Sequence, residues 1–368
     1  MPRRGGRTAD IGSILDLLGD GGFRVGVICG AVAAFVAAVV ALRDGGGPAR
    51  HPWAGLAFAG ASVAGLAQRS LAEGDLLAGL VVLALGAVLA ERLPVGRSVS
   101  DLQRRAIEVA LSLPGAVLVA WSADGRGPGW VPPALVAVVV VGGALLADVD
   151  RRAQLAPVPD TPGPLGLSAT GLVPVLLAIT VFGVWVTVPE TEHVVVLAGV
   201  TLPVALLGWP RPLASLGPVG ASLVVALLAW TVAVDGAERP GAVIGGFACL
   251  GVLAVEPATR WVLALRGPGA DGAPGDPDGG GPAPAHVGDP DGEGADPGPD
   301  VRRPDVRRSL VVLTGLHVVV VAVCARVAGL ETSAVTAFLL SVVVYAVAAV
   351  AVARTPVLGR ARTDHRQG

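Results

Sequence analysis

The sequence predicts an all-α protein, a polytopic transmembrane helix bundle, and three observations carry this prediction. Hydrophobic residues make up 53% of the 368-residue chain and charged residues only 15%, whereas soluble domains carry about 25% charged residues. About eleven apolar stretches approach the length of a membrane span, which needs roughly 20 helical residues. They are apolar on every face, which is typical of spanning helices and not of the alternating strands of barrels.

The predicted spans form a main bundle over residues 25–256 and a C-terminal transmembrane hairpin over residues 309–353. In chain order the spans are 25–42, 53–67, 76–90, 106–122, 130–147, 165–188, 193–209, 213–234, 241–256, 309–329 and 333–353. Segments 53–67 and 76–90 are the shortest. If 53–67 enters the membrane without crossing it, ten spans remain and the N-terminus changes side.

The segments outside the spans have distinct compositions. Residues 1–24 form an N-terminal leader, in which the apolar positions of residues 10–22 are spaced as in a short helix lying on the membrane surface. Residues 354–368 form a tail with several arginines. An arginine excess marks cytoplasmic loops, which places the tail and the 257–308 loop in the cytoplasm, beneath the cell inner (plasma) membrane.

The 257–308 loop contains the one clear linker. Residues 267–300 include 11 Gly, 8 Pro and 8 acidic residues, a composition that cannot bury enough apolar surface to offset the entropy of ordering. We therefore expect a disordered linker. The arginines after it are expected to lie on anionic lipid headgroups; they are Arg302, Arg303, Arg307 and Arg308.

Composition and spacing favour no cofactor, metal or nucleic-acid partner, and they do not indicate an oligomeric state. The net charge is −2, which gives no basic surface for nucleic acid. Residues 289–300 resemble a calcium-binding loop, but prolines interrupt it, so an acidic linker is the preferred interpretation. Asp148 and Asp150 have the Asp-x-Asp spacing of glycosyltransferases, for which a helix end at the membrane face is the simpler explanation.

Ionisable residues inside spans are rare and are the default candidates for function. Glu108 can pair with Arg104, and Glu256 with Arg260, so a structural role is expected for these carboxylates. The outer segment 189–194, which includes His193, is interpreted as an ordinary turn, although its acidic residues could attract a cation.

His317 differs from these residues because it lies in the middle of span 309–329. The returning helix brings Tyr345 to the same depth, and Thr314 and Ser341 extend the polar faces of the two helices. We expect these four residues to face inward, where they either bind substrate or relay a proton. The simpler alternative is one interhelical hydrogen bond from a neutral histidine.

Small residues and prolines are expected to shape the bundle. The GxxxG spacings at 26–30 and 241–245 predict close helix packing within the chain. Four prolines lie inside predicted spans and are expected to kink them; they are Pro114, Pro174, Pro203 and Pro218.

The sequence favours a transporter or flippase of a small or lipid-linked substrate. Many short-looped, kinked spans and a buried histidine support this hypothesis, whereas the scarcity of buried charge weakens it. Two alternatives stay open. One is a membrane scaffold that recruits partners through residues 267–300, and the other is a membrane-embedded transferase for lipid-linked substrates. An enzyme is the less favoured class because no catalytic motif is present.

Overall fold

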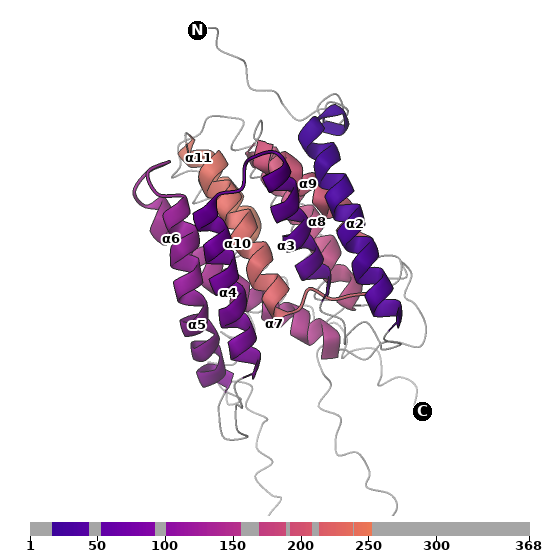
Figure 1. Cartoon of the computed structure of the whole chain (residues 1–368). Coiled ribbons are helices and arrows are strands. Elements are labelled where there is room, and N and C mark those ends of the chain that lie inside the picture. Colours follow the sequence, from indigo (N-terminus) through magenta and orange to yellow (C-terminus); the bar gives the residue numbers. More distant parts are fainter. Residues whose placement is uncertain are drawn as a thin grey trace, which may run out of the picture.

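The computed structural model describes seven segments of the chain, and every regular element in them is a helix (Figure 1). The described residues are 17–43, 53–92, 101–155, 169–188, 192–207, 213–237 and 239–251. The helices are α2 (Gly21–Arg43), α3 (Trp53–Gln68), α4 (Gly74–Arg92), α5 (Asp101–Ser122), α6 (Val131–Ala137), α7 (Gly143–Leu155), α8 (Ala169–Thr187), α9 (Glu192–Ala205), α10 (Pro218–Asp235) and α11 (Pro240–Gly251), with a π-helical turn, η2 (Val138–Gly142), joining α6 to α7. The prediction of an all-α bundle is confirmed for these segments.

Helix α10 is the centre of the bundle. It packs against α3, α4, α7, α9, α11 and η2, with smaller contacts to α5, α6 and α8. Every residue from Gly220 to Ala233 is buried. A helix that is apolar all round is stable only when other helices or lipid surround it, and here other helices surround α10.

Helix α2 buries small residues and exposes large apolar ones, whereas a helix of a soluble protein buries its large apolar residues. Its buried face consists of small residues, apart from Phe23, whereas Ile28, Val32 and Phe35 project outward with 61–69% of their surface exposed. Small residues at helix contacts and large apolar residues facing outward are typical of helices in lipid. This pattern indicates that the outer face of α2 contacts the bilayer.

Four helical segments in the described part of the chain are long and apolar enough to cross a membrane. They are Gly21–Arg43, Gly74–Arg92, Val131–Arg151 and Pro218–Asp235, and three further apolar helices, Ala106–Ser122, Glu192–Ala205 and Pro240–Leu250, are shorter. By the length and composition of its helices, the chain is a multi-pass membrane protein.

Helix α2 packs closely against α9. Gly26 touches Val196 and Gly199 of α9, and Gly30 touches Val200, so α2 and α9 run parallel. Whether 53–67 crosses the membrane or only enters it stays a prediction. Gly26 and Gly30 pack within the chain, as their spacing predicts.

Helix α3 approaches α10 through a contact between two glycines. A Cβ atom built on Gly55 would lie 2.4 Å from the carbonyl oxygen of Leu216 and 2.6 Å from Cα of Gly220. Real side chains do not tolerate such distances, so glycine is required for the two backbones to meet. The backbone N–H of Ala54 also donates to Ser215 O at 2.9 Å.

The N-terminal end of α10 differs from the prediction of a span over 213–234 kinked at Pro218. Residues 213–217 are not helical, and Pro218 is the first residue of the helix. Proline suits this position because its missing N–H would have no partner in the first turn. Gly217 precedes it with φ of +68°, a conformation that favours glycine. Pro114, Pro174 and Pro203 do lie inside helices.

We predict that Gly55→Ala destabilises the bundle and that Gly60→Ala on the same helix does not. The added methyl at residue 55 would meet the backbone of α10, whereas residue 60 has no atom within 4 Å. Overpacking costs about 1–3 kcal/mol, and alanine in an open helical position gains up to about 1 kcal/mol over glycine. Thermal unfolding of both variants in lipid nanodiscs measures the difference. Equal melting temperatures of the two variants would contradict the close contact between Gly55 and Gly220.

Candidate functional site

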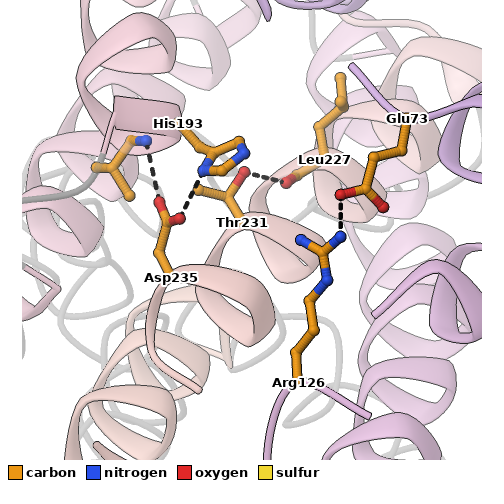
Figure 2. A network of polar contacts seen from close by, with 7 residues as sticks. Glu73, Arg126, His193, Leu227, Thr231 and Asp235 are labelled. Atoms are coloured by element: carbon orange, nitrogen blue, oxygen red, sulfur yellow. Dashed lines mark hydrogen bonds and ion pairs between the residues drawn. The ribbon is translucent and has the colours of Figure 1, made fainter. Parts of the chain in front are cut away.

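A histidine and an aspartate meet at one end of the bundle, between α9 and α10 (Figure 2). His193 is the second residue of α9, and Asp235 is the last residue of α10. The two helices are antiparallel, so these positions lie at the same end. His193 Nδ1 is 2.6 Å from Asp235 Oδ1, and the backbone N–H of Val194 donates to Oδ2 at 3.3 Å.

Both members of the pair are largely removed from solvent. The exposed fraction is 14% for the His193 side chain and 4% for Asp235. An ionised carboxylate can only accept hydrogen bonds, so if Asp235 is ionised, the proton in this contact belongs to Nδ1 of His193. The carboxylate also lies at the N-terminus of α9, where the helix dipole stabilises negative charge.

The imidazole ring is held by an aromatic neighbour as well. Trp230 is completely buried, and its ring is perpendicular to that of His193, with the centroids 5.2 Å apart. Thr231 lies one helical turn before Asp235, and its hydroxyl donates to Leu227 O at 2.8 Å (Figure 2). Trp230, Thr231 and Asp235 thus belong to the last turns of α10, and two of them, Trp230 and Asp235, contact His193.

Two exposed ion pairs occupy the same end, which we call the His193 end. Arg69, after α3, lies 3.2 Å from Glu192 at the start of α9. Arg126, between α5 and α6, contacts Glu73 at the start of α4 (Figure 2). These pairs connect the loops on this side of the bundle, but exposed pairs contribute little to stability.

The Asp-x-Asp pair lies at the opposite end, where one of its carboxylates has a structural role. Asp150 of α7 is completely buried and accepts the backbone N–H groups of Leu216 and Gly217 at 3.1 and 2.8 Å. It thereby bonds the non-helical residues that lead into α10. A structural role is thus supported for Asp150, but the expected helix end is wrong, because α7 continues to Leu155.

Glu108 of α5 has a partner on another helix. Its carboxylate lies 3.1 Å from the Arg151 side chain of α7, and both groups are partly buried. The expected partner was Arg104, whose side chain lies outside the described residues. A structural role for Glu108 is supported, because the pair joins α5 to α7.

The four residues predicted to bind substrate, Thr314, His317, Ser341 and Tyr345, lie outside the described residues and stay predictions. So do the linker 267–300, the anionic-lipid contacts and the pairing of Glu256. The segment 189–194 leads from α8 into α9, and its residues 189–191 lie outside the described part of the chain. His193 lies in the first turn of α9, and its contact with the Asp235 carboxylate was not predicted. Among the described residues, no three metal-ligating side chains come together.

Comparison with known proteins gives no assignment. The chain matches no protein-family model, and neither a curated protein nor a solved structure is detectably similar to it. The function must therefore be argued from the residues of the site.

We predict that His193→Ala lowers the free energy of unfolding by about 3 kcal/mol, because it leaves a buried carboxylate without its main partner. The Asp235→Ala variant should lose a similar free energy of unfolding. The double variant should lose no more than either single variant, because both residues act through one contact. Chemical unfolding in mixed micelles measures these free energies for the wild type and the three variants. Arg69→Ala, which breaks an exposed pair, is the control and should cost less than about 1 kcal/mol. Equal small losses for all variants would contradict the buried bond.

Proposed function

We propose that the protein is a membrane transporter of a small or lipid-linked substrate, and that the His193–Asp235 pair is its proton-binding site. The observation that carries the proposal is the buried histidine–carboxylate contact at 2.6 Å between two neighbouring helices. Ionisable groups within membrane bundles are costly and mark proton or substrate pathways by default. Histidine is the side chain whose charge ordinarily changes between pH 5 and 8.

The central helix α10 has irregular backbone beside it and at the end opposite to the pair, of the kind that transporter sites use. Residues 213–217 are non-helical and largely buried, and η2 inserts a π-helical turn that packs against α10. Irregular backbone at membrane depth is tolerated where protein buries it, and discontinuous helices form the substrate and ion sites of many transporters. These features support a central helix whose contacts can rearrange.

The arginine distribution supports an outward orientation of the pair. The loop between α8 and α9 holds no arginine, and Arg69, Arg126 and Arg239 each stand alone in the other loops at the His193 end. Because arginines are more frequent on the cytoplasmic side, we infer that His193 lies near the outer surface. A proton would reach the pair from outside the cell.

The test is charge movement in proteoliposomes adsorbed to a solid-supported membrane. A step from about pH 8 to about pH 6, which spans the ordinary titration range of histidine, should give a transient current in the wild type. His193→Ala should abolish the current. His286→Ala, the same substitution within the linker, should preserve it. An unchanged current in His193→Ala would contradict the proton site.

Solute panels in the same device test transport itself. At constant pH, a small polar or lipid-linked solute that is carried should produce a current, and deletion of 267–300 should leave this current intact. The scaffold alternative, favoured only by the linker composition, predicts no solute response and loss of function on deletion. If the proteoliposomes give a current on the pH step but none with any solute, the proposal of transport is contradicted, whereas the proposal of a proton site at His193 still stands.

A further inference from the structure

Two fully buried polar atoms have no hydrogen-bonding partner within the described part of the chain. They are the Ser62 hydroxyl of α3 and the indole Nε1 of Trp230 of α10, and both residues are 0% exposed. The indole N–H can only donate, whereas the hydroxyl can donate and accept. Buried polar groups in proteins are nearly always bonded to protein or to ordered water. We therefore expect each of these two atoms to have a hydrogen-bonding partner in the membrane.

The register of α3 and α10 brings the two residues to similar depths. The helices run parallel. Gly55 meets Gly220 near their starts, and both helices end near the start of α9, with Arg69 beside Glu192 and Asp235 beside His193. Two turns further along, Ser62 lies on the same face of α3 as Gly55, and Leu227 lies on the same face of α10 as Gly220. Trp230 follows Leu227 by three residues, or about 4.5 Å along the helix.

The polar groups continue from this point to the His193 end. The Trp230 ring contacts the ring of His193, and Thr231 shares a helix face with Asp235. The Thr231 hydroxyl gives its proton to Leu227 O, so its lone pairs can accept another bond. When His193 is neutral with its proton on Nδ1, Nε2 is an acceptor too. Hydrogen-bonding groups of α3, α10 and α9 thus lie between Ser62 and the His193–Asp235 pair. They are the Ser62 hydroxyl, the Trp230 N–H, the Thr231 oxygen and Nε2 of His193.

We propose that this stretch between α3, α9 and α10 is an internal hydration site. Bound water accepts the Trp230 N–H and bonds the Ser62 hydroxyl, and it reaches the oxygen of Thr231 and Nε2 of His193. A buried water needs two to four polar partners, and these four groups supply them. Such water gives the imidazole a hydrogen-bonded neighbour inside the bundle. The site does not depend on transport, since a scaffold could hold the same water.

The test uses the full-length protein in lipid nanodiscs with ¹⁵N-labelled tryptophan. Magnetisation transferred from water should appear on the Trp230 Nε1 proton, although the residue is completely buried. Trp130, which is 41% exposed at the His193 end, is the positive control in the same spectrum. The signal is assigned through Trp230→Phe. If that variant does not fold, single Trp→Phe changes at the other tryptophans of the seven assign it by elimination.

Ser62→Ala should reduce the transfer to Trp230 by about twofold or more, because the water loses one of its few partners. The matched control is Ser222→Ala, also in a buried position, whose hydroxyl already donates to Pro218 O at 3.1 Å. It should leave the transfer unchanged. Transfer to Trp130 without any to Trp230 would overturn the hydration site. Equal transfer from water to Trp230 in the Ser62→Ala variant and in the wild type would overturn the claim that one water bonds both residues. Neither result would alter the pH-step current of His193.

Discussion

Contact between glycine backbones sets the spacing of the helices, and the other features of the bundle depend on that spacing. Gly55 meets Gly220, and Gly26 meets Gly199. Lipid gives helices no hydrophobic reason to associate, so close packing and polar contacts must hold them together. The glycines allow α3 and α9 to approach α10 and α2 closely. Helix α3 also packs against α9, where Gly65 lies beside Val196. Both α9 and α10 therefore pack on α3, and His193 at the start of α9 reaches the last residue of α10.

Two buried aspartates then hold the central helix at its ends. Asp150 bonds the backbone N–H groups that lead into α10, and Asp235 bonds the N-terminal turn of α9. Both carboxylates thus accept N–H groups at helix starts, where the helix dipole favours negative charge. The first contact fixes a non-helical stretch that lipid could not accommodate. The second brings in a histidine, so the same arrangement that anchors α10 also creates the candidate site.

Hydropathy predicted the helices and the small-residue packing of Gly26 and Gly30, because both depend on composition over a whole span. It did not predict where α10 begins, since an apolar run continues through residues that Gly217 and Pro218 exclude from the helix. The His193–Asp235 pair was missed because each residue flanks a different span. Consecutive spans run in opposite directions, so the start of span 193–209 and the end of span 213–234 could be expected at the same end of the bundle. Only burial in the folded bundle shows that the pair avoids solvent.

The central claim is that the imidazole of His193 donates its Nδ1 proton to a buried carboxylate, and ¹⁵N spectra of histidine-labelled protein test it most directly. His193 can be assigned by the His193→Ala variant among the five histidines. We expect a proton on Nδ1 both in the neutral ring and in the charged ring, and loss of this preference in Asp235→Ala. A neutral ring protonated on Nε2 alone, or a spectrum unaffected by Asp235→Ala, would contradict the account.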